Sequence, residues 1–243
     1  MAEAIEQLRC QSEDWGIELG VPQIRLLATY ADLLTRYELA NVIGTRDWNQ
    51  IILEHFIDSL SCLKVVDKQR NYCLIDVGTG GGLPGIPLSV ARPDLRVVLL
   101  ETTEKKVRFL EYVKAELKLE NLRVLHARAE EAAARDSRFR EAFDLATARA
   151  LAALPVVLEY CAPFVRIGGK VLAMKGRLQE EELSQGVAAA HKLGAELSET
   201  LEVAYRSQLP QKERRLLVFD KTSLTPARFP RRIGLAKKRP LGS

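Results

Sequence analysis

Cysteine is scarce in this 243-residue chain, and the four that occur are Cys10, Cys62, Cys73 and Cys161. No two of them form a C-x-x-C pair, so the sequence predicts neither a zinc site nor a disulfide framework. Long hydrophobic runs are also missing, and none is long enough to span a membrane. The first residues are acidic and lack the apolar segment of a signal peptide. We therefore expect a cytoplasmic protein without a metal site.

Basic residues are unevenly distributed along the chain, which has a formal net charge of +4. Residues 206–243 contain 11 lysines and arginines and 2 acidic residues, a net of +9. The remainder, 1–205, has 25 basic and 30 acidic residues, a net of −5. A mildly acidic body with a basic end indicates a polyanionic partner, but a solvated tail has the same composition.

One stretch, from Leu74 to Gly85, is rich in glycine and follows an apolar run. The run predicts a buried strand, the glycines a tight turn, and Pro84 and Pro87 the first turn of a helix. Glycines remove side chains, so a ligand can approach the backbone and the turn can adopt positive φ. We expect a small ligand on this turn; a glycine-rich turn without a ligand is the alternative.

The spacing of the glycines separates two kinds of ligand. A dinucleotide fingerprint requires G-x-G-x-x-G after a strand, but here Leu83 stands at the third glycine position. The arrangement Asp76-x-Gly78-x-Gly80-x-Gly82 is similar to motif I of class I methyltransferases, which bind S-adenosylmethionine. A nicotinamide-dependent oxidoreductase of the same fold is the alternative, and the missing glycine argues against it.

Strand-like and helical runs alternate from residue 71 onward, which is typical of a parallel sheet with helices on both faces. The predicted strands are 72–77, 96–101, 122–126, 143–148 and 170–174, with 201–205 and 216–220 as possible closing strands. The predicted helices are 84–92, 103–118, 129–135, 150–164 and 180–193. Residues 1–66 are expected to form a helical extension.

Within this extension, a helix over 48–66 is predicted by a capping box at Asp47 and Gln50 and by an apolar stripe. Its other face carries His55, Asp58, Ser59 and Cys62. A polar face is usually solvated. A histidine, a carboxylate and a hydroxyl within reach of one another can also act on a substrate, and both interpretations stay open.

Polar groups follow the predicted strand ends, where open α/β sheets bind ligands. Glu101 ends the second strand, and a carboxylate there can accept hydrogen bonds from the hydroxyls of a ribose. It could equally cap the next helix. After the third strand, the backbone at Ala129 and the side chain of Glu130 could address an adenine edge.

Two cations, Arg149 and Lys175, end the fourth and fifth predicted strands. Two neighbouring cations favour an anionic or guanine-like substrate. The chain has no Asn-Pro-Pro-Tyr-type motif for methylating an exocyclic amine, and no cysteine lies there to attack a pyrimidine ring. Nearer the C-terminus, cations that include Arg214 alternate with prolines and suit contacts with RNA phosphates.

Together these motifs resemble the GidB/RsmG family, bacterial methyltransferases that modify N7 of a guanine in 16S ribosomal RNA. The resemblance covers about residues 41–220. It rests on six segments: Asn-Val-Ile-Gly-Thr-Arg-Asp at 41–47, His-Phe-Ile-Asp-Ser-Leu at 55–60, the glycine-rich stretch at 76–88, Arg-Ala-Glu-Glu at 128–131, Ala-Arg-Ala at 148–150 and Met-Lys-Gly at 174–176.

The resemblance implies an α/β fold: a Rossmann-like class I methyltransferase sheet with helices on both faces and an N-terminal helical extension. It divides the chain into the extension at 1–66, an S-adenosylmethionine-dependent methyltransferase domain at 67–222 and a basic C-terminal tail at 223–243. The implied partner is 16S ribosomal RNA or the 30S subunit. The family's usual target is guanine 527 of that RNA.

The same resemblance, with the residue patterns above, gives the expected site. Cofactor contacts are expected at Gly78, Gly80, Leu83, Glu101, Ala129, Glu130 and Arg149. RNA contacts are expected at His55, Arg149, Lys175 and Arg214. Two positions differ from the family pattern, because Glu101 stands where aspartate is common and Arg215 where histidine is frequent.

The implied chemistry needs neither a general base nor a metal. Guanine N7 carries a free lone pair, so no proton must leave before it attacks the methyl group in line with the leaving sulfur. The enzyme's task is then positioning. We expect Arg149 or Lys175 to donate to O6 or to a phosphate and never to N7, which must stay free. A non-catalytic RNA-binding module with a vestigial pocket is a third alternative.

Overall fold

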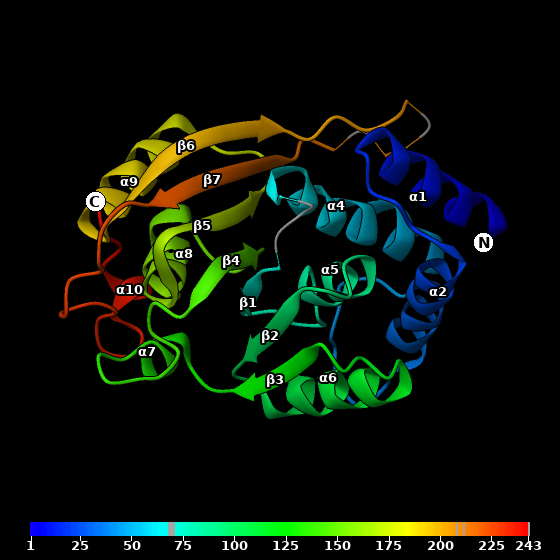
Figure 1. The fold of residues 1–243 in the computed structure, drawn as a ribbon, viewed down its shortest axis with the longest axis horizontal. Coiled ribbons are helices and arrows are strands. Elements are labelled where there is room, and N and C mark those ends of the chain that lie inside the picture. The colour runs from blue at the N-terminus through cyan, green and yellow to red at the C-terminus, as the bar shows by residue number, and fades with distance from the viewer. Residues whose placement is uncertain (68–70, 208, 211, 243) are drawn as a thin grey trace.

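A mixed β-sheet crosses the centre of the molecule and carries helices on both faces (Figure 1). The computed structural model describes residues 1–67, 71–207, 209–210 and 212–242, whose strands form one seven-stranded sheet of order β3-β2-β1-β4-β5-β7-β6. They are β1 Cys73–Val77, β2 Arg96–Glu101, β3 Leu122–His126, β4 Phe143–Arg149, β5 Val165–Lys175, β6 Ala195–Glu202 and β7 Arg215–Lys221. Strands β1 to β5 pair in parallel, and β7 runs antiparallel between β5 and β6. The expected α/β fold is confirmed.

Most strands lie where the apolar runs predicted them, and β2 and β3 match at both ends. Two strands differ. The strand β5 was expected at 170–174 and spans Val165–Lys175, and β6 was expected at 201–205 and spans Ala195–Glu202. The side chains of β6 are mostly polar and exposed; it lies at one edge of the sheet, with only one of its sides paired, and β3 lies at the other edge. An edge strand of this kind gives no apolar run for the sequence to reveal.

The helices fill the expected intervals except α10, which lies in the segment that was expected to be a basic tail. In the N-terminal extension they are α1 Ala2–Asp14, α2 Val21–Arg36, α3 Trp48–Gln50, the π-helical η1 Ile51–Phe56, α4 Ile57–Leu60 and the 3₁₀-helical η2 Ser61–Val65. Beyond it they are α5 Gly85–Ala91, α6 Glu104–Glu116, α7 Ala129–Ala132, α8 Leu154–Cys161, the 3₁₀-helical η3 Ala162–Phe164, α9 Glu180–Lys192 and α10 Leu235–Lys238. Within the described residues, none of these helices is both long and apolar enough to cross a membrane.

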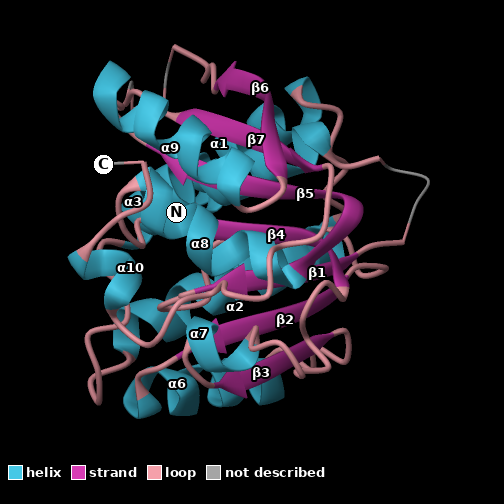
Figure 2. Cartoon of the chain, turned by 90° about the vertical axis from the view of Figure 1, so that its left-hand side faces the viewer, coloured by secondary structure: helices cyan, strands magenta, loops and turns pink. Residues whose placement is uncertain are grey.

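Two hydrophobic cores lie on opposite faces of the sheet, whose strands are stacked from β6 to β3 in Figure 2. Successive side chains of a strand point to opposite faces, so Leu74 joins one core and Ile75 the other. The first core joins α5 and α6 to the N-terminal helices, and the second joins α7, α8, α9 and α10. The extension is therefore packed against the sheet.

The predicted helix over 48–66 is one rod whose winding changes along its length, from α3 through η1 and α4 to η2. The carboxylate of Asp47 accepts a hydrogen bond from the backbone N–H of Gln50 at 2.8 Å, as the capping box predicted. The apolar stripe is buried. The second face is not solvated, however, because Asp58 is 5% exposed and Ser59 and Cys62 are fully buried. The solvated interpretation of this face is wrong.

The chain after β7 folds back onto the sheet. Phe229 and Ala236 are buried in the second core. The guanidinium of Arg140 donates to the backbone oxygens of Thr225 and Phe229 at 2.6 and 2.8 Å. These contacts fix the segment over the body of the protein, so the interpretation of residues 223–242 as a solvated tail does not describe them.

Candidate functional site

The glycine-rich turn leaves the end of β1 at the carboxyl edge of the sheet. The backbone N–H groups of Gly78 and Thr79 donate to the oxygen of Leu100 on β2 at 2.9 and 3.2 Å. Three glycines have positive φ, namely 68° at Gly78, 61° at Gly80 and 99° at Gly82. Only glycine adopts this region without steric cost, so the turn could not be built from other residues.

Some of the missing side chains are explained by the protein's own packing. A Cβ on Gly81 would lie 2.7 Å from the backbone oxygen of Val42, and one on Gly85 would lie 2.2 Å from Cδ2 of Leu99. The expectation that these glycines make room for a ligand is therefore too broad. At Gly80 the nearest atom to such a Cβ is 4.0 Å away, so that site is sterically open.

The carboxylate of Asp76 stabilises this turn through hydrogen bonds. It accepts hydrogen bonds from the hydroxyl of Thr79 at 2.5 Å, the N–H of Gly85 at 2.9 Å and the hydroxyl of Thr147 at 3.0 Å. Burial raises its pKa to about 6, although the three donors oppose that shift. Asp76 thus joins β1, the turn, β4 and the start of α5.

A crevice of about 290 Å³ opens above the turn. It is lined by Val77, Gly78, Leu100, Glu101, Thr102, Lys106, Ala127, Arg128, Ala129, Glu130, Ala150, Leu151, Tyr160, Gly234 and Lys237. Four of the seven expected cofactor residues line it, namely Gly78, Glu101, Ala129 and Glu130. The crevice follows the carboxyl ends of β1, β2 and β3, where ligands bind in sheets of this type.

The other three expected cofactor residues do not line the crevice. Gly80 lies behind it, where its N–H donates to Oε2 of Glu101 at 3.0 Å. The side chain of Leu83 is packed in the first core and is 6% exposed. Arg149 faces a different pocket. Contact of these residues with a cofactor stays a prediction.

Glu101 performs the capping role that the sequence left open. Its Oε1 accepts from the N–H groups of Thr102 and Thr103 at 2.8 and 2.9 Å, at the start of α6. Because Oε2 accepts a hydrogen bond from the N–H of Gly80, the carboxylate also links α6 to the glycine turn. The carboxylate lines the crevice as well, so a ligand's hydroxyls could reach it.

A second pocket, of about 320 Å³, adjoins the crevice. It is lined by His55, Asp58, Arg149, Ala150, Met174, Lys175, Gly176, Arg177 and Arg214. All four expected RNA residues, which come from η1, β4, β5 and the position just before β7, are brought together here. Ala150 lines both pockets and is therefore the point where they meet.

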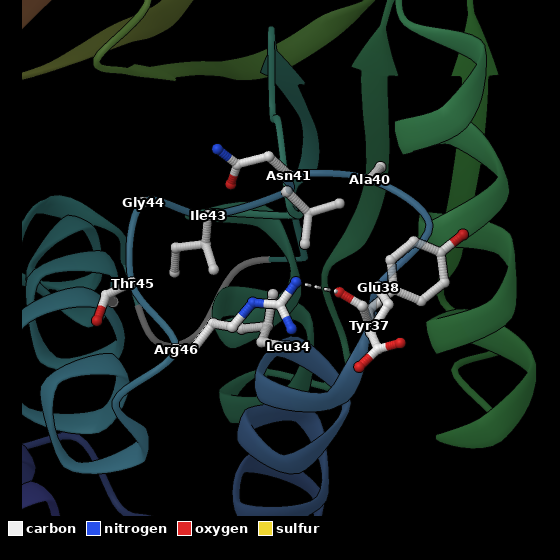
Figure 3. A pocket seen from close by; sticks show the side chains of 10 residues that line it. Leu34, Tyr37, Glu38, Ala40, Asn41, Ile43, Gly44, Thr45 and Arg46 are labelled. Atoms are coloured by element: carbon white, nitrogen blue, oxygen red, sulfur yellow. Dashed lines mark hydrogen bonds between the residues drawn. The ribbon is translucent and has the colours of Figure 1, made fainter.

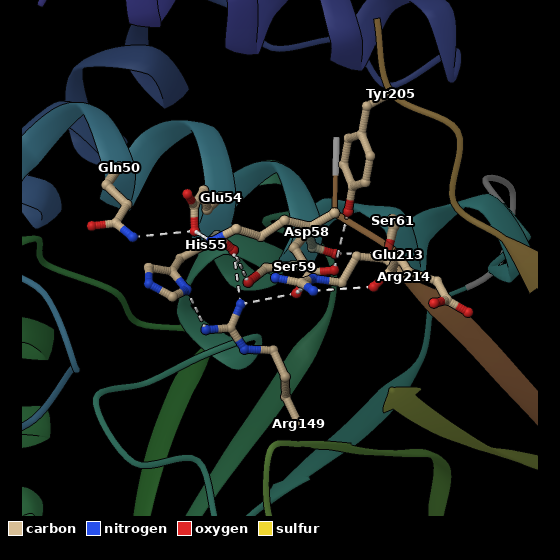
Figure 4. Close-up of polar contacts among 11 residues, drawn as sticks. Gln50, Glu54, His55, Asp58, Ser59, Ser61, Arg149, Tyr205, Glu213 and Arg214 are labelled. Carbon is tan, nitrogen blue, oxygen red and sulfur yellow. Dashed lines mark hydrogen bonds and ion pairs between the residues drawn. The ribbon is translucent and has the colours of Figure 1, made fainter. Parts of the chain in front are cut away.

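A buried carboxylate organises this second pocket (Figure 4). Asp58 pairs with the guanidinium of Arg149 at 3.1 Å and with that of Arg214 at 3.7 Å. It also accepts a hydrogen bond from the hydroxyl of Tyr205 at 3.3 Å. Burial raises the pKa of Asp58, and the two arginines oppose that shift. The carboxylate thus holds two cations at the pocket wall.

The same network fixes the state of His55. Nη2 of Arg149 lies 2.7 Å from Nδ1 of His55. Arginine can only donate, so Nδ1 must accept and the ring hydrogen must reside on Nε2. Burial, with the charge of Arg149 next, lowers the pKa of His55 to about 4. The histidine is therefore neutral near pH 7 and presents an N–H donor from the wall of the pocket.

The predicted cations are largely engaged by the protein itself. Besides His55 and Asp58, Arg149 has the backbone oxygen of His55 as a partner, at 3.3 Å. Nζ of Lys175 contacts Oε1 of Glu182 at 2.7 Å and the oxygen of Ala152 at 3.1 Å. Arg215, which departs from the family pattern, pairs with Glu213 at 2.9 Å.

A third cavity, of about 450 Å³, lies where the loop after α2 passes behind the glycine turn (Figure 3). Its wall consists of residues from α2 and from the segment 38–46, and Arg46 there donates to the backbone oxygen of Tyr37 at 3.3 Å. None of the expected site residues lines it. The segment 41–47 therefore supports the turn through Val42 without contributing to the two pockets.

Several lining residues were missed from the sequence, among them Arg177, Leu151 and Tyr160. Ala150 was missed as well, although its φ of 51° is unusual for a residue with a side chain. Such strain persists at sites that the surrounding structure holds in place. Gly234 and Lys237 lie about 80 residues beyond the fourth strand, and no local pattern connects them with the crevice.

Comparison with known proteins finds close relatives. The family model for rRNA small subunit methyltransferase G (GidB) matches residues 23–210. The ribosomal RNA small subunit methyltransferase G of Rubrobacter xylanophilus is 47% identical over 239 residues, which cover 98% of this chain and 91% of that protein. The protein of the same name from Acetivibrio thermocellus is 40% identical over 228 residues, or 93% of this chain and 92% of that one.

Solved structures support the fold. TrmN from Thermus thermophilus superimposes with a TM-score of 0.51 at 18% identity, covering 68% of this chain and 48% of that one. The antibiotic-resistance methyltransferase Kmr gives a TM-score of 0.51 at 20% identity, covering 63% of this chain and 87% of that one. At these identities the similarity bears on the fold alone.

Proposed function

The chain belongs to the GidB family of rRNA small subunit methyltransferase G proteins, and on that basis we propose that it methylates N7 of a guanine in 16S ribosomal RNA. The methyl donor is S-adenosylmethionine. The observation that carries the proposal is the pair of pockets that meet at Ala150. One pocket would hold the donor, and the other would hold the guanine. Since the substrate is ribosomal RNA, the proposed location is the cytoplasm, and the proposed target is guanine 527.

The residues of the crevice fit S-adenosylmethionine. Glu101 offers a buried carboxylate to two ribose hydroxyls. The part of the donor that carries the sulfur would lie over Gly78, in the space that Cδ1 of Leu151 occupies here, 2.4 Å from where a Cβ would be. Ala129 and Glu130 lie where an adenine would extend along the sheet edge. Gly80 and Leu83 would act through the turn, since neither lines the crevice, the N–H of Gly80 donates to Glu101 and Leu83 is packed in the first core. The turn lacks the third glycine of the dinucleotide-binding fingerprint, so the oxidoreductase alternative has no support here.

The second pocket fits a guanine that has been turned out of the RNA. A base must be unstacked to enter a pocket of this kind. His55 is the donor best placed to bind guanine O6, because its Nε2–H lies on the wall and its other nitrogen is occupied by Arg149. Arg177 and Arg214 at the same pocket would contact phosphates. The sequence led us to expect Arg149 or Lys175 as the donor to O6 or to a phosphate. With both cations engaged within the protein, His55 takes the place of the donor to O6.

The chain's own residues would promote the reaction by position and electrostatics. S-Adenosylmethionine supplies a methyl group bound to a sulfonium; its carbon–sulfur bond breaks toward sulfur as the lone pair of N7 forms the new bond. No proton leaves, and the positive charge passes from sulfur to the guanine ring. Correct placement of reacting groups can contribute roughly 7–11 kcal/mol to such a step. The neutral state of His55 avoids a further cation beside the charged product.

The proposal is tested by incubating 30S particles that lack the modification with labelled S-adenosylmethionine and mapping the product. We expect one 7-methylguanine in the 16S RNA, at guanine 527. The control is the same particle preparation with boiled protein. Label found only on ribosomal protein or on a small metabolite would refute the RNA assignment. Absence of any turnover would favour the RNA-binding module.

A further inference from the structure

Two residues that line the cofactor crevice, Gly234 and Lys237, come from the end of the chain. The family model ends at residue 210, so both lie beyond it. They line the crevice together with Ala129 and Glu130. The segment that carries them, 228–239, was expected to serve RNA, because it is basic. Its position relates it to the cofactor instead.

An ion pair fixes this segment to the body. Arg231 and Glu159 on α8 make several contacts, with Nε at 2.8 and 3.1 Å from the two carboxylate oxygens and Nη2 at 2.5 Å from Oε2. The backbone N–H of Arg231 also donates to Oε1 of Glu159 at 3.0 Å. Glu159 is only 1% exposed. A buried carboxylate with this many donors defines the position of the segment closely.

The segment then reaches a residue of the crevice directly. The N–H of Gly234 donates to Oε1 of Glu130 at 2.9 Å. Tyr160, which follows Glu159 on α8, lines the same crevice, and burial together with the charge of Glu130 raises the pKa of Tyr160 to about 12. The carboxylate of Glu130 therefore has Gly234 as a hydrogen-bond donor and the buried Tyr160 near it. The hydrogen bond depends on the position of the C-terminal segment.

We propose that residues 228–239 form the outer wall of the adenosine end of the cofactor site and position Glu130 for the adenine. The inference rests on the proposed use of S-adenosylmethionine. Arg231 is a positioning residue, since it acts on the site through the segment. Lys237 is the second residue of the segment that lines the crevice. Cofactor affinity is thereby coupled to an ion pair remote from the reacting methyl group.

The test measures binding of two probes by calorimetry, S-adenosylhomocysteine and 5′-methylthioadenosine. The second probe carries the adenosine end and lacks the amino-acid group. The variant is the double substitution Glu159→Gln with Arg231→Gln, which loosens the anchor without leaving a buried charge unpaired. We expect the dissociation constant of both probes to rise about tenfold. The matched control is Arg232→Gln, an exposed neighbour, which should bind like wild type.

A second variant keeps the test decisive if the double variant fails to fold. Lys237→Ala changes an exposed residue of α10, and Lys238→Ala is its control on the same helix. We expect Lys237→Ala to raise the dissociation constant of both probes about threefold and Lys238→Ala to leave it unchanged.

The outcomes separate this inference from the proposed function. Wild-type affinity in both the double variant and Lys237→Ala would overturn the inference, whereas the proposed function would stand if wild type binds S-adenosylhomocysteine. Weaker binding of ribosomal RNA with unchanged probe affinity would also overturn it, because the segment would then serve the RNA. Failure of wild-type protein to bind S-adenosylhomocysteine would overturn both.

Discussion

Arg149 donates to Nδ1 of His55 across 2.7 Å, and the contact sets the tautomer of the histidine. The arginine is itself held by Asp58 at 3.1 Å. A helix of the N-terminal extension and the end of β4 are thus joined at the wall of one pocket. As a result, the group that can donate to a substrate is the Nε2–H of His55. Arg149, at the end of β4, holds the histidine ring in this tautomer.

The first prediction separates the two nitrogens of His55. In His55→Gln the amide nitrogen can replace Nε2–H, whereas in His55→Asn the amide oxygen can replace only the acceptor Nδ1. We expect kcat/KM for methylation of 30S particles to fall about 10- to 30-fold in His55→Asn and His55→Ala, the loss of one buried hydrogen bond. His55→Gln should stay within about threefold of wild type.

Binding of S-adenosylhomocysteine serves as the control for these variants and should not change, because His55 lines the second pocket and not the crevice. Equal losses in the Gln and Asn variants, or full activity in His55→Ala, would show that Nε2 does not bind the substrate.

The second prediction concerns pH and stability. The folded-state pKa of His55, about 4, is below its ordinary value of 6.5. Between these values the unfolded chain binds a proton that the folded protein does not, so the free energy of unfolding falls as pH falls from 6.5 toward 4. Relative to His55→Gln, wild type should lose about 1 kcal/mol between pH 7 and pH 5, a figure reduced for the partial exposure of the ring. Urea unfolding of both proteins at each pH measures this. Parallel pH profiles would mean that His55 titrates normally.

The third prediction tests the buried carboxylate of the network. Asp58→Asn leaves Arg149, whose side chain is 14% exposed, without its counter-charge. We expect the free energy of unfolding to fall by about 3 kcal/mol, as for other broken buried pairs. The control is Glu104→Gln, which breaks an exposed pair with Arg108 and should cost at most about 0.5 kcal/mol. Similar costs for the two variants would exclude an organising role for Asp58.

The fourth prediction concerns the glycines of the turn. In Gly85→Ala the new Cβ would lie 2.2 Å from Cδ2 of Leu99 and 3.0 Å from Oδ2 of Asp76. Overpacking of this kind should destabilise the protein by about 1–3 kcal/mol in chemical denaturation. Gly44→Ala is the matched control, since no atom lies within 4 Å of its Cβ. Its stability should remain within about 0.5 kcal/mol of wild type. A neutral Gly85→Ala would contradict the close packing of α5 on β2.

The sequence predicted those parts of the fold that depend on local patterns. Buried runs located β1 to β4, and the glycine spacing located the turn, because both follow from residues near one another in the chain. Glu101 and Arg149 were placed at one sheet edge by the rule that parallel strands end together. The edge strand β6 escaped prediction because its polar side chains carry no buried periodicity.

The remaining features arise from contacts distant in sequence. The pairs Arg149–Asp58 and Arg231–Glu159 join residues 91 and 72 positions apart. Neither pair has a local signature, so the polar face at His55 and Asp58 was expected to be solvated as readily as functional. The basic end was likewise assigned by its composition. Its attachment to α8 through Arg231 and Glu159 is seen only in the folded structure.

A crystal structure with S-adenosylhomocysteine tests the two-pocket arrangement most directly. The account predicts that the ribose hydroxyls lie within hydrogen-bond distance of the Glu101 carboxylate, with the base beside Ala129 and Glu130 and the sulfur turned toward Ala150. Without a ligand, Cδ1 of Leu151 lies 2.4 Å from where a Cβ of Gly78 would be, so this side chain must turn aside. A structure in which Leu151 keeps that position, while the nucleoside binds elsewhere, would contradict the two-pocket arrangement.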